Sequence, residues 1–267
     1  MITRYSRKEL TDIWSEYNKY QIWLDVEIAA AEGMEKLGTI PKGVTRVVRK
    51  KAQINVKRIH NIEAKVKHDV IAFLTSVTEK VGIKARYLHQ GMTSSDVVDT
   101  SFNIQLVQSG KILVKDIDQI LKVLKSKAKK YKFTPCMGRS HGIHAEPITF
   151  GLKLASYYEE FKRNRKRLIS AIDEISTCAI SGAVGTFANI NPNVEKHVAK
   201  KLGLKVEPIS TQVIPRDRHA HYFSVLGIIA GSVERVSTEI RHLQRTEVFE
   251  LQEFFSNKQK GSSAMPH

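Results

Sequence analysis

The feature that most constrains this fold is a proline-free stretch from Ser95 to about Lys130 that keeps one face apolar. The apolar positions on this face step by three and four residues: Leu113, Ile117, Ile120, Leu124 and Ala128. This spacing predicts an α-helix. At a rise of 1.5 Å per residue, the helix would be about 50 Å long. The mean helix of a globular protein has only about 11–12 residues.

Two further long apolar repeats follow in the sequence. One begins after Pro147 and continues to Ile175, and the other begins after Asp217 and continues to Leu251. Three long helices with heptad-like spacing predict a long bundle or the core of an oligomer. Shorter helices are expected before them, over residues 20–37, 44–52, 56–66 and 69–81.

The chain is therefore predicted to be all-α and to have two parts. An N-terminal helical domain is expected over residues 1–92, and a central long-helix bundle over residues 93–267. Only the segment from Cys178 to Phe187 gives a weak strand-pair signal. Polar, glycine-rich connections separate the long helices, and functional residues tend to lie in such loops.

The charge balance favours anionic partners. Lys and Arg total 43 against 27 Asp and Glu, which gives a formal net charge of +16. A polyanionic metabolite, a nucleic acid or a merely solvated lysine surface would each fit this charge. Nucleic acid is disfavoured because aromatic residues make up only 7% of the chain and no basic stripe contains interleaved aromatics.

Cellular location follows from what the sequence lacks. No apolar run approaches the roughly 18 residues of a membrane span, and the first residues contain no signal-peptide core. Two cysteines, Cys136 and Cys178, do not suggest a disulfide framework. We expect a cytoplasmic protein without membrane contact.

The first candidate loop reads QGMTSSD over residues 90–96. Thr93 and Asp96 have the spacing of a capping box at the start of the long helix. The free N–H groups of a helix N-terminus, together with nearby hydroxyls, also favour a carboxylate or phosphate. Both interpretations apply to this loop.

The second loop reads GRSHGIHAEP over residues 138–147 and permits three interpretations. Gly138-x-Ser140-x-Gly142 matches a nucleophile elbow, which requires a preceding strand and an α/β sheet. His141 and His144 could ligate zinc, although no third ligand has suitable spacing and no metal is expected. His141 could instead be a general acid or base, because imidazole titrates near ~6.5.

The last loop reads GSSAMPH over residues 261–267, and its composition is that of a flexible terminal segment. Its paired serines could turn hydroxyls and N–H groups toward an anion. Weaker candidates are Arg4-Tyr5, Lys67-His68-Asp69 and Thr211-Gln212, and Asp69 is the expected helix cap in the second of these.

Together, these loops resemble the adenylosuccinate lyase family of the fumarase/aspartase superfamily. The resemblance rests on QGMTSSDVVDT (90–100), GRSHGIHAEP (138–147) and GSSAMPH (261–267), and it extends over the whole chain. It implies an all-α subunit of three domains that forms a homotetramer and needs no cofactor. The implied reaction is β-elimination of fumarate from adenylosuccinate, giving AMP, and from the succinyl-carboxamide ribotide of purine synthesis.

The resemblance also implies roles for individual residues. Ser262 matches the base that removes the Cβ proton, and His141 matches the acid that protonates the leaving nitrogen. His68 resembles a second active-site histidine, and Arg4 and Tyr5 resemble contacts to the nucleotide phosphate. The positions that match other substrate contacts are Lys67, Asp69, Thr93, Ser94, Ser140, Gln212 and Ser263. Most members have Thr at position 140, and serine keeps that hydroxyl.

The resemblance finally implies that the chain is an inactive fragment. The lysine and asparagine that follow the last loop in the family are absent, as are the rest of the bundle and the C-terminal domain. Family active sites are assembled from several subunits. The alternatives are another lyase of the superfamily, a basic helical nucleic-acid-binding protein, and a helical scaffold whose loops are only caps.

Overall fold

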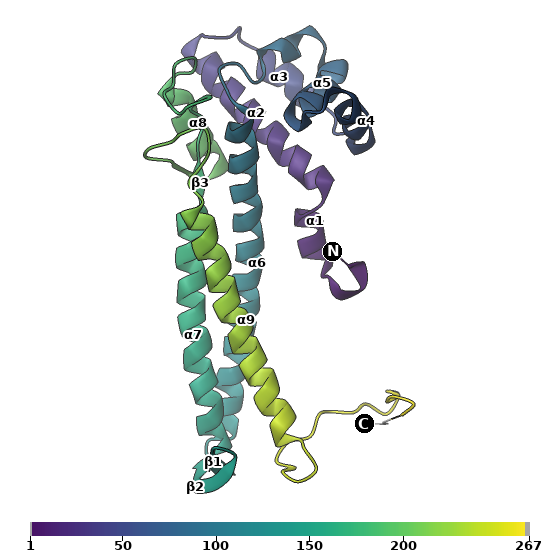
Figure 1. Ribbon diagram of the computed structural model, residues 1–267, viewed down its shortest axis with the longest axis vertical. Helices are drawn as coiled ribbons and strands as arrows, with labels where there is room; N and C mark the ends of the chain where they lie inside the picture. Colours follow the sequence, from purple (N-terminus) through teal and green to yellow (C-terminus); the bar gives the residue numbers. More distant parts are fainter. Residues whose placement is uncertain (1, 265–267) are drawn as a thin grey trace. The chain divides into compact units, whose positions relative to one another are not determined.

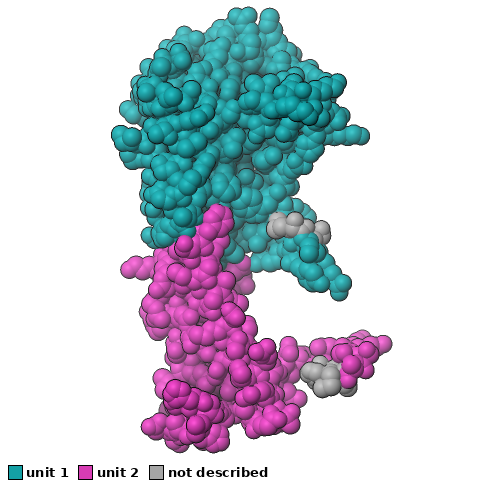
Figure 2. Space-filling view, in the orientation of Figure 1, with its two compact units in different colours: residues 1–114, 169–222 teal, residues 115–168, 223–267 magenta. Residues whose placement is uncertain are grey.

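The computed structural model describes residues 2–264, and these residues form two compact units (Figure 2). Unit 1 comprises residues 1–114 and 169–222, and unit 2 comprises residues 115–168 and 223–267. Three long helices, α6 (Ser94–Lys130), α7 (Phe150–Ile175) and α9 (Asp217–Leu243), each contribute residues to both units (Figure 1). The predicted all-α class is confirmed, since helices account for most of the chain.

The remaining helices lie in unit 1, and short strands occur in both units. They are η1 (Thr3–Tyr5), α1 (Lys8–Ile13), α2 (Glu16–Leu37), α3 (Val44–Lys51), α4 (Val56–Val66), α5 (Asp69–Val81), η2 (Ile83–Tyr87), β1 (Pro135–Ser140), β2 (Ile143–Thr149), β3 (Thr177–Cys178), α8 (Pro192–Leu202) and β4 (Lys205–Val206). None of the described helices is long and apolar enough to span a membrane.

The core of unit 1 forms around α2, whose side chains are buried on nearly every face. A helix that is apolar all round must be covered on all sides, and α3, α4 and α8 pack against it, as does Phe73 of α5. Tyr20 and Trp23 of α2 meet Phe73 of α5, with ring centroids 6.0 and 5.5 Å from that of Phe73. Aromatic pairs at these separations stabilise a core beyond simple area burial.

Local sequence explains where α2 begins and ends. The Ser15 hydroxyl accepts a hydrogen bond from the Asn18 N–H, which caps the first turn. Gly38 takes a left-handed conformation with φ 73°, which ends the helix without a Cβ penalty. Helices α5 and α8 likewise combine a side-chain cap, His68 or Asn191, with a glycine after the last residue.

Unit 2 contains the C-terminal part of α6, most of α7 and most of α9. Tyr157, Phe161 and Leu168 of α7 are buried at positions spaced as one helical face requires. Ion pairs link the helices at their edges, with Arg165 bonded to Asp118 at 2.5 Å and Arg235 paired with Glu160. The predicted long-helix bundle therefore has a structural counterpart here.

Three expectations differ from the structure. The third long helix ends at Leu243, because its carbonyl accepts the N–H groups of Glu250 and Leu251 across a turn. The strand signal at 178–187 is only partly right, since β3 pairs in parallel with β4. Residues 138–147, expected to be a loop, lie within the antiparallel hairpin of β1 and β2.

The predicted domain division after residue 92 stays a prediction. The start of α6 at Ser94 lies close to it, yet both compact units are discontinuous in sequence. Chain discontinuity arises because α6, α7 and α9 each cross from one unit to the other.

Candidate active site

Three loops meet at the N-terminus of α6 in unit 1, and glycines allow their close approach. Gly91 has φ 71°, and a Cβ there would overlap the carbonyl of Asn189. Gly185 has φ 79°, and a Cβ there would overlap the carbonyl of Ser210. Loops 88–93, 181–190 and 207–216 are thereby placed against one another, although they are far apart in sequence.

Asp96, in the first turn of α6, joins two of these loops. Its side chain is buried and accepts the N–H groups of Thr93 (3.0 Å), Gly182 (3.0 Å) and Ser181 (3.2 Å). The bond from Thr93 is the carboxylate half of the predicted capping box. Burial raises the pKa of Asp96 to about 6, against the lowering effect of the three N–H donors.

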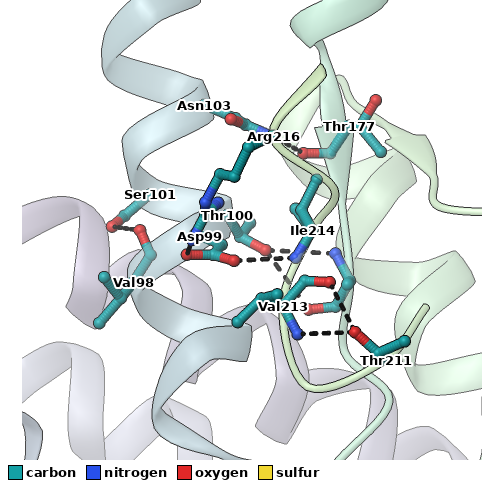
Figure 3. A network of polar contacts seen from close by, with 11 residues as sticks. Val98, Asp99, Thr100, Ser101, Asn103, Thr177, Thr211, Val213, Ile214 and Arg216 are labelled. Atoms are coloured by element: carbon teal, nitrogen blue, oxygen red, sulfur yellow. Dashed lines mark hydrogen bonds and ion pairs between the residues drawn. The ribbon is translucent and has the colours of Figure 1, made fainter. Parts of the chain in front are cut away.

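Asp99, one turn further along α6, holds the third loop (Figure 3). It accepts the Ile214 N–H and an Arg216 guanidinium N–H, both at 2.9 Å. Figure 3 shows Thr211 bonded within the same loop to Val213. Gln212, a predicted substrate contact, is exposed between them and is thereby placed near the start of α6.

Thr93 and Ser94 are the predicted contacts at this helix N-terminus. Both are half-buried, and among the described residues neither hydroxyl makes a hydrogen bond. Hydroxyls beside the positive end of a 37-residue helix favour an anion. The structure brings Thr93, Ser94 and Gln212 into one loop cluster.

His89 is a residue of this cluster that sequence analysis missed. It has φ 60°, an uncommon conformation for a non-glycine residue. Glu27 on α2, which is fully buried, accepts from the His89 N–H (2.8 Å) and contacts Nδ1 (2.6 Å). Burial lowers the pKa of His89, but the bond to Glu27 and the charges of Glu27 and Asp96 raise it overall. These bonds hold the 88–93 loop against α2.

Lys67, His68 and Asp69 form the junction between α4 and α5. Lys67 ends α4 in a left-handed conformation with φ 56°. His68, rather than Asp69, is the N-cap of α5, since its Nδ1 accepts from the Ile71 N–H at 3.4 Å. Asp69 instead accepts from the adjacent Val70 N–H. All three side chains remain wholly or partly accessible to solvent.

Arg4 and Tyr5 lie in η1, near the N-terminus. Both are exposed, and the Arg4 guanidinium lies 5.8 Å from the centroid of the Tyr5 ring. Among the described residues, no hydrogen bond or ion pair joins them to the loop cluster at the start of α6. Their predicted contact with a nucleotide phosphate stays a prediction.

His141 lies at the tip of the β1–β2 hairpin in unit 2. Ser140 pairs with Ile143, so His141 and Gly142 form a two-residue turn. Both have positive φ, 54° and 79°, as a type I′ turn requires. Glycine suits that conformation, whereas histidine adopts it at a cost often found at functional sites. The strand–turn–strand context excludes the nucleophile elbow, which needs a helix after the turn.

Neighbouring residues of the hairpin are tied to the end of the chain. Arg139 forms an ion pair with Glu250 at 2.5 Å, and the Cys136 thiol lies 3.2 Å from the same carboxylate. Gly138 is packed against the Glu146 carbonyl of the opposite strand, where a Cβ would overlap it. The base of the hairpin is thereby fixed, while Ser140 and His141 at its tip are exposed.

Ser262 and Ser263 also belong to unit 2 and are exposed. The Ser262 hydroxyl accepts from the Ala264 N–H at 3.3 Å, which forms a short turn. Residues 265–267 of the last loop (261–267) lie outside the described residues. Among residues 2–264, no hydrogen bond joins this loop to His141.

Comparisons with known proteins match this architecture. The chain is 51% identical over 267 residues to adenylosuccinate lyase of Thermotoga maritima and 53% identical to that of Streptococcus mutans. Each match covers all of this chain and 62% of the relative, so the chain spans less than two thirds of their length. The crystal structure of a fumarate lyase from Mesorhizobium sp. BNC1 superimposes with a TM-score of 0.86 at 25% identity, over 91% of this chain and 59% of that one.

A family pattern described as "Lyase" matches residues 3–267, which is nearly the whole chain. The fold, the loop motifs and the relatives agree with that match. The chain therefore belongs to this lyase family, within the fumarase/aspartase superfamily.

Proposed function

We propose that the protein eliminates fumarate from adenylosuccinate, giving AMP, and from the succinyl-carboxamide ribotide, giving the carboxamide ribotide. The observation that carries this proposal is 51–53% identity to adenylosuccinate lyases over every residue of the chain. Three similar solved structures, a fumarate lyase, a 3-carboxy-cis,cis-muconate lactonizing enzyme and a beta-carboxy-cis,cis-muconate cycloisomerase, are 25–28% identical. The proposed reaction is carbon–nitrogen bond cleavage in the cytoplasm, with no metal or cofactor.

In the proposed reaction, Ser262 removes the Cβ proton of the succinyl group. The electron pair is delocalised onto the adjacent carboxylate, and donors aimed at that carboxylate stabilise the transition state. The C–N bond then breaks, and His141 gives its proton to the leaving nitrogen. The exposed position of His141 on a fixed hairpin supports this role, because an acid must reach the substrate.

The loop cluster of unit 1 supports recognition of an anionic substrate. Thr93 and Ser94 at the N-terminus of α6 suit a carboxylate or phosphate. Lys67, His68, Asp69, Gln212, Arg4 and Tyr5 are proposed as further contacts, as are Ser140 and Ser263 beside the catalytic pair.

The proposal includes assembly into a homotetramer. The part of α9 in unit 2 exposes large apolar side chains, among them Ile228 (49%), Val233 (44%) and Ile240 (47%). Such exposure on a long helix is typical of surfaces that associate. We also propose that residues 1–267 alone have little activity, because the chain spans 62% of the relatives' length.

The test of His141 uses the chain completed to the relatives' length. We expect His141→Ala to slow elimination by roughly 10²–10⁴-fold, as the loss of a general acid does. His144→Ala is the matched control, since His144 is exposed on the same hairpin. Equal rates for both variants, or unchanged turnover in His141→Ala, would contradict the assigned role.

A further inference from the structure

A second concave site lies in unit 1, where the end of α2, the start of α3 and α8 come together. Its volume is about 910 Å³. Four lysines from three separate segments line it: Lys36, Lys42, Lys200 and Lys201. None of the residues predicted for the active site contributes to this basic pocket.

Two glutamates also line the basic pocket, but both already have partners. Glu32 pairs with Arg49 at 2.7 Å and with Lys201 at 3.3 Å. Glu35 accepts the Thr45 N–H at 2.7 Å, which caps the first turn of α3. The charge of Glu32 is therefore paired, whereas Glu35 keeps its negative charge, and the four lysines still outnumber the two glutamates of the lining.

The remaining three lysines have no carboxylate partner. Among residues 2–264, Lys42 and Lys200 make no ion pair or hydrogen bond. The ammonium group of Lys36 donates to Nδ1 of His197 at 3.3 Å. Its positive charge is therefore bonded to a ring nitrogen and is not paired with a carboxylate. A cleft lined by an excess of one sign of charge concentrates ions of the opposite sign.

We propose that the basic pocket binds an oligophosphate, either as inorganic triphosphate or as the phosphate chain of a nucleoside triphosphate. Lysine binds phosphate as a compact point charge, and cations from three segments suit several linked phosphates better than one. The described lining includes no Phe, Tyr or Trp on which a base could stack, and the imidazole of His197 is mostly buried between Lys36 and Glu32. Recognition is therefore of the phosphates and not of the base.

Isothermal titration calorimetry of the 267-residue chain with inorganic triphosphate tests the proposal. We compare the unsubstituted chain with the double variant Lys42→Gln/Lys200→Gln. Neither lysine has a partner among residues 2–264, so the variant is expected to fold normally, as circular dichroism would verify. Lys122→Gln/Lys125→Gln is the matched control, because it removes the same charge from exposed positions on α6 in unit 2.

We expect triphosphate to bind the unsubstituted chain and the control alike, and to bind the pocket variant roughly tenfold more weakly. ATP should behave like triphosphate, while AMP should bind far more weakly at this site. The proposal would be overturned if triphosphate did not bind, or if both variants lost the same affinity for triphosphate. It would also be overturned if AMP bound as tightly as triphosphate. No elimination is measured, so the result is independent of the proposed function.

Discussion

Replacing Glu27 by glutamine tests whether a buried ion pair holds the loop cluster at the start of α6. The substitution keeps the size of the side chain and removes its charge. Glu27 is fully buried and makes two hydrogen bonds to His89, one to the backbone N–H and one to Nδ1. An amide can accept one of these bonds, but its NH₂ group forces Nδ1 to act as an acceptor.

The expected cost follows from this geometry. A hydrogen bond to a charged group contributes about 1.5–3 kcal/mol, so we expect Glu27→Gln to reduce the free energy of unfolding by that amount at pH 6. The melting temperature should fall by roughly 3–12 °C, at about 2–4 °C per kcal/mol.

The pH dependence has a defined sign. The pKa of His89 is raised in the folded protein, so its stabilising contribution is complete below the unfolded value of about 6.5. That contribution is lost as pH rises through the folded pKa. The difference between the unsubstituted chain and Glu27→Gln should therefore be largest near pH 6 and smaller at pH 9.

Urea unfolding followed by tryptophan fluorescence measures this difference, since both tryptophans, Trp14 and Trp23, lie in unit 1. Glu16→Gln is the matched control, because Glu16 pairs with His60 at 2.7 Å in an exposed setting. The control should change stability by less than about 1 kcal/mol. Equal losses in the two variants, or a Glu27→Gln difference independent of pH, would refute the reasoning.

Two further predictions concern helix α8 and the loops of unit 1. Burial raises the pKa of Glu195 to about 7, so its contribution to stability decreases as pH rises from about 4.5 to 7. Glu195→Gln should therefore be more stable than the unsubstituted chain at pH 8, by up to about 3 kcal/mol, and similar at pH 5 in urea unfolding. Lower stability of the variant at pH 8 would contradict this. Gly91→Ala should cost roughly 2–4 kcal/mol in thermal unfolding, because the new Cβ meets the Asn189 carbonyl. Gly203 has φ 69° and open space around it, so Gly203→Ala should cost only about 1 kcal/mol. Equal losses of stability in the two variants would show that backbone strain, and not the contact with the Asn189 carbonyl, sets the cost of Gly91→Ala.

The helices could be predicted because their signals are local. The expected range 69–81 coincides with α5, which ends at Gly82. The predicted start and end of α6 are within one residue of those observed. Helix α8 has equally local signals, with Asn191 as cap, Pro192 at its first position and Gly203 after its end, but these were not recognised.

The arrangement of the site could not be predicted, because it depends on contacts between distant residues. Glu27 and His89 are 62 positions apart, and Asp96 reaches Gly182 across 86 positions. The hairpin that carries His141 was also missed, since its strands are mostly exposed and lack the alternating apolar pattern of a half-buried strand.

The most direct test of the proposed function is the absorbance of adenylosuccinate in the presence of the chain completed to the relatives' length. The fumarate and AMP that form would be quantified in the same reaction. We predict that both products appear in equal amounts, and that residues 1–267 alone produce little of either. A completed protein that is folded and tetrameric, yet leaves adenylosuccinate unchanged, would contradict the proposed elimination.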